Sequence, residues 1–236
     1  LNHLSKLEKI LDGIYLINEL SPKTTDKLLS FGELLSSLII YETMKLHDLN
    51  IQLKNSQNLI VTDSNFTNAA VNFGETNENI VTYFDSNDKI ISILPGFISK
   101  SENGEITTLG RGGSDYTAAI IAAAMNASVL QIWTDVSGMF TSNPKSVKNA
   151  KPIKKLSYLE AIELSHFGAK VLYPPTVLPV LSKHIPLLIK NTLAPQDEGT
   201  LITHLVENRN PNPIKGISNI NNIALLTLQG NGMVGI

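Results

Sequence analysis

Helix-like and strand-like segments alternate along this chain, and that alternation limits its possible folds more than any other feature. Apolar residues at three- and four-residue spacing predict helices at 4–17, 22–29, 34–46, 116–125, from 157 onward and from 174 onward. Short apolar runs predict strands at 59–62, 89–94, 129–134 and 185–190. Strands joined through helices run parallel, and a parallel sheet is buried on both faces. We therefore expect an α/β fold with a mainly parallel sheet.

Composition narrows the class of protein. A chain of 236 residues can bury one sizeable core, or one domain and part of a second. The net charge of −2 gives no electrostatic reason to expect a nucleic acid or an anionic membrane as partner, and no apolar run is long enough to span a bilayer. The chain has no cysteine, which excludes disulfides and thiolate catalysis and is compatible with a cytoplasmic protein. The five histidines have no metal-ligand spacing, so we expect no metal held by the protein alone.

Local signals predict where several elements start and stop. The Ser-x-x-Glu pattern of a capping box occurs at 30–33 and at 157–160, each before an apolar run. Pro174-Pro175 predicts another helix start, and Gly168 a helix end. The segment 102–105 predicts a hairpin turn.

A glycine-rich loop at 109–115 is the strongest local signal for a binding site. Gly110, Gly112 and Gly113 allow a close backbone approach, and the loop leads directly into a predicted helix, whose N-terminus favours anions. Arg111 is suited to a carboxylate or a phosphate. Ser114 and Asp115 are suited to an anion and to a nucleophile or metal, respectively. The alternative is a plain glycine turn with Ser114 or Asp115 as N-cap, which is the commoner meaning of an isolated loop of this kind.

A second candidate site follows the strand predicted at 129–134. Thr134 and Asp135 stand at its carboxyl end, where open α/β sheets bind ligands. The polar loop after them carries Phe140, which can stack on a base, and Lys145, which can meet a phosphate. The alternative is a surface turn in which Asp135 caps its own backbone. Lys170 can bind phosphate or complement a helix C-terminus, and Glu33 is either a ligand or only a capping acid.

The end of the chain has a different composition. The segment 206–216 is polar, contains Pro211 and Pro213, and reads as a linker. The run 223–228 then predicts the first strand of a further domain. We expect one domain at 1–205, followed at 206–236 by a linker and the beginning of a second domain.

Six stretches, in this order, resemble the aspartokinase branch of the amino-acid kinase family. They are SFGE at 30–33, PGFI at 95–98, TTLGRGGSD at 107–115, IWTDVSG at 132–138, FGAKVLYP at 167–174 and EGT at 198–200. The resemblance covers about residues 6–203. It implies a three-layer α/β/α sandwich and transfer of a phosphoryl group from ATP, with Mg²⁺, to the β-carboxylate of aspartate. That reaction is the first step toward lysine, threonine and methionine.

The same resemblance implies roles for individual residues. The aspartate pocket would comprise Glu33, Phe97, Arg111, Gly112, Gly113 and Ser114, with Glu33 facing the α-amino group and Arg111 a carboxylate. The nucleotide pocket would comprise Thr134, Asp135, Phe140, Lys145 and Lys170. Asp115 and Lys170 would be the catalytic residues beside the transferred phosphoryl group.

Two departures and one further similarity complete the comparison with the family. Asn143-Pro144-Lys145 stands where the family has Asp-Pro-Arg, and Lys lacks the bidentate fork of Arg. The family's opening Lys-Phe-Gly-Gly-Thr-Ser is not in this chain, so we expect 1–205 to be a kinase domain without its N-terminal strand. Either the chain is a piece of a longer protein, or it cannot catalyse as it stands. The segment 214–224 is similar to the entry into the regulatory ACT region of bifunctional aspartokinase–homoserine dehydrogenases. Fusion to a homoserine dehydrogenase, allosteric control and a homo-oligomer are therefore expected.

Three other functions compete with this interpretation. A glutamate or acetylglutamate kinase would share the fold, but the SFGE and FGAK elements argue against it. A non-catalytic binding module would keep the pocket without the first lysine. An oxidoreductase would need a dinucleotide fingerprint, and the chain contains neither GxGxxG nor GxxxxGK[ST].

Overall fold

The structure is a computed structural model that describes residues 2–87, 90–166, 172–204 and 214–219. The helices are α1 (Asn2–Ile17), α2 (Pro22–Lys45), α3 (Phe73–Asp85), α4 (Gly113–Ala124), α5 (Tyr158–His166) and α6 (Leu178–Ser182), with 3₁₀ turns at Ser56–Asn58 and Pro174–Val177. The strands are β1 (Ile51–Leu53), β2 (Val61–Thr62), β3 (Ile91–Ile93), β4 (Ile98–Ser101), β5 (Ile106–Thr108), β6 (Leu130–Thr134), β7 (Lys155–Ser157), β8 (Leu187–Asn191) and β9 (Thr200–Thr203).

The strands pair mainly in parallel, as the alternation of elements predicts. They form three sheets among the described residues, with orders β1-β3, β2-β4-β5 and β6-β8-β9-β7. The pairs β1–β3, β2–β4, β6–β8 and β7–β9 are parallel, whereas β4–β5 and β8–β9 are antiparallel. The antiparallel β4–β5 pair is the hairpin predicted at 102–105, and its turn is closed by hydrogen bonds between Ser101 and Glu105 and between Gly104 and Ser101. The α/β class is therefore confirmed.

Two helices begin at the capping signals of the sequence, but a third capping signal does not mark a helix start. The Ser21 hydroxyl accepts from the Thr24 N–H and caps α2, with Pro22 in the first turn. Ser157 and Glu160 form the predicted capping box of α5. The box predicted at 30–33 is wrong, because α2 runs unbroken through it. The Ser30 hydroxyl instead donates to the Lys27 carbonyl inside the helix. The helix end predicted at Gly168 lies outside the described residues.

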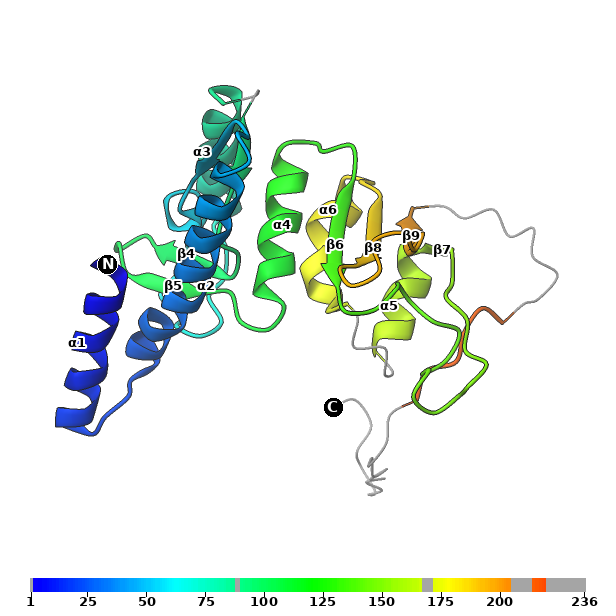
Figure 1. Ribbon diagram of the computed structural model, residues 1–236, viewed down its shortest axis with the longest axis horizontal. Coiled ribbons are helices and arrows are strands. Elements are labelled where there is room, and N and C mark those ends of the chain that lie inside the picture. The colour runs from blue at the N-terminus through cyan, green and yellow to red at the C-terminus, as the bar shows by residue number, and fades with distance from the viewer. Residues whose placement is uncertain (1, 88–89, 167–171, 205–213, 220–236) are drawn as a thin grey trace, which may run out of the picture.

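Helix α4 stands between the N-terminal elements and the sheet that contains β6 (Figure 1), and its side chains contribute to two hydrophobic cores. The N-terminal core comprises Leu59, Ile60, Ile80, Leu109 and Ile120. The C-terminal core is larger and includes Leu130, Ile132, Met139, Leu156, Val180, Leu187, Ile189 and Ile202, together with Ala119 and Ala122 of α4. Alternate faces of this one helix are thus buried against different sets of strands, and α4 joins the two halves of the molecule.

A buried carboxylate fixes α2 to the sheet of the N-terminal half. Asp26 is fully buried, and its carboxylate accepts from the Thr67 N–H at 2.8 Å, the Thr108 N–H at 3.1 Å and the Thr108 hydroxyl at 2.7 Å. Charge-assisted hydrogen bonds of this kind offset the cost of burying the charge. The anchor holds the part of α2 that carries Glu33, two turns further on.

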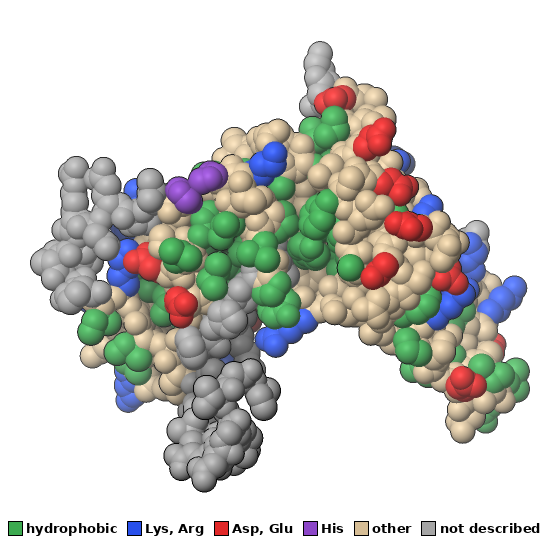
Figure 2. All heavy atoms as spheres, turned by 180° about the vertical axis from the view of Figure 1, so that it is seen from behind, with side chains coloured by type: hydrophobic (Ala, Val, Ile, Leu, Met, Phe, Trp, Pro, Cys, Tyr) green, Lys and Arg blue, Asp and Glu red, His purple; other side chains and the backbone are tan. Residues whose placement is uncertain are grey.

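The surface is mixed in character. On the face shown in Figure 2, hydrophobic side chains gather over the middle of the molecule, and acidic side chains lie toward the side that holds α3. None of the described helices combines the length and the apolar character needed to cross a bilayer.

Candidate active site

The glycine loop forms the entry to α4. Gly110 has φ +70° and Gly112 φ +71°, a left-handed conformation that glycine adopts without strain. Gly112 is the N-cap residue and Gly113 the first residue of α4, so the helix begins earlier than the predicted Tyr116. Ser114 and Asp115 consequently lie in the first helical turn, and the reading of either as a plain N-cap is wrong. The free N–H groups of this turn give the loop the local positive potential that attracts anions.

The segment containing Phe97 packs directly on this loop. A Cβ on Gly113 would lie 2.7 Å from a Phe97 ring carbon, and a Cβ on Gly96 would lie 2.8 Å from the Ser114 Cα. Phe97 itself has φ 68°, an uncommon value for a bulky residue. Its N–H donates to the Thr117 hydroxyl at 3.0 Å, and its carbonyl accepts from the Leu109 N–H at 2.9 Å. The structure thus brings Phe97, Gly112, Gly113 and Ser114 together, in a backbone conformation held from both sides.

The carboxyl groups of Glu33 and Asp115 both have altered pKa values. Burial raises the pKa of Glu33, and burial likewise raises the pKa of Asp115. Neither carboxylate forms an ion pair with another described residue. A partly desolvated carboxylate of this kind gains from a cationic ligand, and perturbed acidity in a cleft is typical of functional groups.

Arg111 is exposed at the tip of the glycine loop. Its guanidinium lies 5.3 Å from the centre of the Tyr173 ring, in a cation–π arrangement that orients the side chain. Tyr173 belongs to the same FGAKVLYP stretch as Lys170. Lys170 itself lies outside the described residues.

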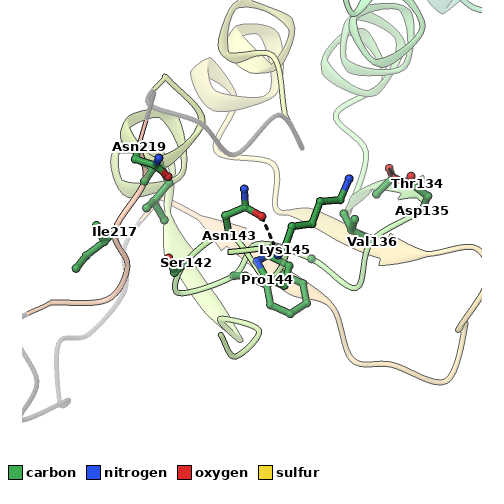
Figure 3. A pocket seen from close by; sticks show the side chains of 13 residues that line it. Thr134, Asp135, Val136, Ser142, Asn143, Pro144, Lys145, Ile217 and Asn219 are labelled. Carbon is green, nitrogen blue, oxygen red and sulfur yellow. Dashed lines mark hydrogen bonds between the residues drawn. The ribbon is translucent and has the colours of Figure 1, made fainter. Parts of the chain in front are cut away.

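The second candidate site is a cavity of about 550 Å³ at the carboxyl end of β6. All four of the described residues predicted to bind nucleotide line it, namely Thr134, Asp135, Phe140 and Lys145. The Lys145 side chain extends from its loop toward the side on which Thr134 and Asp135 lie (Figure 3). Asn143 shapes this loop, because its side-chain oxygen accepts from the Lys145 N–H at 3.0 Å.

The loop that lines the cavity is tied to β9. The Thr200 hydroxyl accepts from the Met139 N–H at 2.8 Å and donates to the Ile153 carbonyl at 2.6 Å. Close packing requires glycine on both sides of this contact. A Cβ on Gly138 would lie 2.4 Å from the Thr200 hydroxyl oxygen, and a Cβ on Gly199 would lie 2.0 Å from the Ile189 carbonyl oxygen. These contacts explain why the EGT stretch accompanies the pocket.

The cavity has a wall that the sequence did not predict. Ile217, Ser218 and Asn219 line it, together with Leu164 of α5. Figure 3 shows Ile217 and Asn219 on one side of the cavity and Thr134 and Asp135 on the other. The polar linker and the similarity of 214–224 to the entry into an ACT region gave no indication that these residues line the cavity.

The two candidate sites lie at the same end of the molecule. Helix α4 and strand β6 run in opposite directions, so that the N-terminus of α4 and the carboxyl end of β6 are at one edge (Figure 1). A helix N-terminus, which favours anions, and a cavity at a strand end therefore lie at the same edge, which suits a reaction between two anionic ligands.

Known proteins resemble this chain in both sequence and structure. The model of the amino acid kinase family matches residues 3–191. The bifunctional aspartokinase/homoserine dehydrogenase of Buchnera aphidicola is 37% identical over 228 residues, which is 96% of this chain and 28% of that protein. The crystal structure of E. coli aspartokinase III in complex with aspartate and ADP is 36% identical with a TM-score of 0.79, over 86% of this chain and 47% of that one. The Clostridium acetobutylicum aspartate kinase gives 34% identity and a TM-score of 0.75, over 92% of this chain and 46% of that one.

This chain spans between about a quarter and about half of the length of these relatives. Within that span, the family model matches most of the chain, and the solved structures share its fold at well over a quarter identity. The chain belongs to the amino acid kinase family.

Proposed function

We propose that this chain is the catalytic part of an aspartate kinase, which transfers the γ-phosphoryl group of ATP to the β-carboxylate of L-aspartate. The observation that carries the proposal is the position of the two candidate sites. A glycine loop with Arg111 at a helix N-terminus and a cavity lined by the four predicted nucleotide residues lie at one end of the α4–β6 pair. The relative solved with both aspartate and ADP supports the same pair of ligands.

In the proposed reaction, a carboxylate oxygen of aspartate attacks the γ-phosphorus of ATP as the bond to ADP breaks. The nucleophile is already ionised near neutral pH, so it needs no strong base. The protein has to hold two anions in line and neutralise their charge. Arg111 binds a carboxylate of aspartate, Glu33 binds its ammonium group, and the N–H groups at the start of α4 face the transferred group. Asp115 and Lys170 complete the surroundings of the phosphoryl group.

Magnesium fits this site as a companion of the nucleotide. The described residues contain no cluster of three His, Asp or Glu side chains that would form a protein cage for an ion. Mg²⁺ retains several waters and binds kinase sites mainly through substrate phosphates and one or two carboxylates, which Asp115 and Asp135 can offer. When bound, the ion neutralises charge on the phosphates.

Larger features of the parent protein are also part of the proposal. Similarity to bifunctional aspartokinase/homoserine dehydrogenases extends over nearly the whole chain, which supports a fused dehydrogenase and a place in threonine, lysine and methionine biosynthesis. We infer that 1–205 is the kinase domain and that 206–236 leads into a regulatory ACT region.

The test is a coupled assay of ADP release by the intact protein as its gene encodes it. L-Aspartate should support turnover, and L-glutamate should support at least about a hundredfold less, because one extra methylene moves the carboxylate out of line with the phosphorus. Equal rates with glutamate, or release of ADP that does not depend on aspartate, would contradict the proposal. Trapping the acyl phosphate with hydroxylamine identifies the product directly.

A further inference from the structure

Residues 214–219, here called the return segment, lie against the kinase domain. The Ile217 N–H donates to the Thr141 carbonyl at 2.8 Å, so the segment is hydrogen-bonded to the loop that lines the cavity. Gly216 passes so close to α5 that a Cβ there would lie 3.1 Å from the Leu164 Cδ2 atom and 3.4 Å from the Thr141 carbonyl oxygen. These contacts fix residues 216 and 217 at a specific place beside Thr141 and Leu164.

An ion pair fixes the return segment to α5. The Lys215 ammonium lies 2.7 Å from the Glu160 Oε1 atom, and the two side chains are only 17% and 32% exposed. The other carboxylate oxygen of Glu160 accepts from the Ser157 N–H at 2.8 Å and from the Ser157 hydroxyl at 3.0 Å. Burial acts to raise the pKa of Glu160, but Lys215 and Ser157 together hold that pKa below its ordinary value. Lys215 is well shielded from water and Glu160 is about a third exposed, so solvent screens this pair somewhat less than a fully exposed one.

Residues 217–219, which follow Lys215 and Gly216, line the cavity. Ile217 is 65% exposed and presents an aliphatic side chain, while Ser218 and Asn219 carry hydrogen-bonding groups. An aliphatic surface beside hydrogen-bonding side chains matches the apolar face and polar edge of a nucleobase. Ile217 and Asn219 lie on the side of the cavity opposite Thr134 and Asp135, as Figure 3 shows.

We propose that residues 217–219 of the return segment form the nucleobase-binding wall of the nucleotide pocket and that the Lys215–Glu160 ion pair positions this wall. The inference rests on the proposed function only in taking the cavity as the nucleotide site. Lys215 acts as a positioning residue, since it holds Ile217, Ser218 and Asn219 in place without touching the ligand. The strength of nucleotide binding thereby depends on where the chain runs after the linker.

The test compares ADP binding by calorimetry in variants of the intact protein. Lys215→Ala should weaken ADP binding about five- to tenfold and raise the KM for ATP in the same ratio, while the KM for aspartate and kcat stay within about twofold. Lys215→Arg should restore most of the affinity because it retains the charge. The matched control is Lys23→Ala, which removes the ion pair of Lys23 with Glu105 in the other half of the molecule and should leave ADP binding unchanged.

An ADP affinity of Lys215→Ala equal to that of the unmutated protein overturns the inference, and so does an equal loss of affinity in Lys23→Ala. If Lys215→Ala does not fold, hydrogen exchange in the unmutated protein decides. ADP should slow exchange at the amides of 214–219, and unchanged exchange there counts against the inference.

The proposed function and the inference fail in different ways. If the protein binds ADP but does not phosphorylate aspartate, the proposed function is wrong. The Lys215 and Lys23 variants still test the role of the return segment in that case. Absence of ADP binding in the unmutated protein removes both.

Discussion

At the scale of single residues, the carboxyl group of Glu33 has two opposing properties. Its partial burial raises its pKa, so ionisation costs more in the folded protein than in the unfolded chain. The proposed aspartate site nevertheless needs it ionised, because the negative charge attracts the α-ammonium group. Stability and substrate binding therefore make opposite demands on this side chain.

That conflict predicts a separation of the two properties in Glu33→Gln. A raised pKa means that the stabilisation from the protonated form is complete below the ordinary pKa and is lost as pH rises through the folded-state value. At pH 7 the melting temperature of Glu33→Gln should therefore be no lower than that of the unmutated protein, and somewhat higher. Scanning calorimetry measures both temperatures. The KM for aspartate should rise at least about tenfold, the typical effect of losing a charged hydrogen bond.

The pH dependence supplies the control. The KM for aspartate should rise as pH falls through the raised pKa of Glu33, beginning above the 4.5 of an ordinary glutamate. Glu33→Gln should lose that component, whereas Glu42→Gln, an exposed change on the same helix, should keep it. Identical profiles in all three proteins would rule out the role given to Glu33.

Arg111 provides the complementary prediction. Its guanidinium is exposed and contacts the Tyr173 ring, and it forms no ion pair with a carboxylate in the described part of the chain. Arg111→Ala should raise the KM for aspartate roughly 10- to 100-fold through the loss of a charge-assisted contact and change the KM for ATP much less. Arg111→Lys should recover only part of the loss because it lacks the planar fork. Unchanged aspartate kinetics in Arg111→Ala would refute the assignment.

At the scale of elements, the Asp26 anchor decides how α2 sits on its sheet. Asp26→Ala leaves the buried N–H and hydroxyl of Thr108 and the partly buried N–H of Thr67 without their acceptor, which should lower the free energy of unfolding by about 2–4 kcal/mol. Asp63→Ala is the matched control, since Asp63 also accepts from two backbone N–H groups but at an exposed position. Its loss should stay below about 1 kcal/mol. Urea unfolding measures the free energy of unfolding of both variants. Equal losses of that free energy would mean that burial of the carboxylate is unimportant.

The connection between β8 and β9 gives a second prediction at this scale. Gly199 and Gly104 have nearly the same positive φ, +77° and +82°. An added Cβ meets the Ile189 carbonyl oxygen in the first case and nothing within 4 Å in the second. Gly104→Ala should cost about 1 kcal/mol of left-handed strain, and Gly199→Ala distinctly more, because strand backbone has to move. Gly199→Ala should also weaken ADP binding through Thr200, and equal costs at the two sites would contradict this account.

Individual helices and strands were easier to predict from the sequence than the contacts between them. The helix at 116–125, the helix start at 157–160 and the four predicted nucleotide residues of the cavity follow from periodicity, capping and position at a strand end. All of these signals are local. The pattern at Ser30 misled because the same residue types are tolerated inside a helix whose other turns are strongly held, here through Asp26. The wall formed by Ile217, Ser218 and Asn219 was not predictable, since it depends on a long-range return of the chain that leaves no periodic signature.

At the scale of the whole molecule, the shared helix α4 predicts cooperative behaviour. Because Ala119 and Ala122 belong to one core and Ile120 to the other, neither half can unfold without exposing a face of this helix. ADP should therefore raise the midpoint of a single thermal transition, by the equivalent of about 2.7 kcal/mol at a hundredfold excess over Kd. Adenosine, which lacks phosphates, should have a smaller effect. Two resolved transitions, with only one shifted by ADP, would show that the halves are independent.

The position of α4 also has an evolutionary consequence. A substitution on most helices can be compensated by neighbours on a single side, but Ala119 and Ile120 face different neighbours one residue apart. A mutation that rotates this helix or enlarges one of its side chains to suit one core disturbs the contacts with the other core. We therefore expect its sequence to drift slowly as lineages diverge, with changes accepted mainly in matched pairs across an interface.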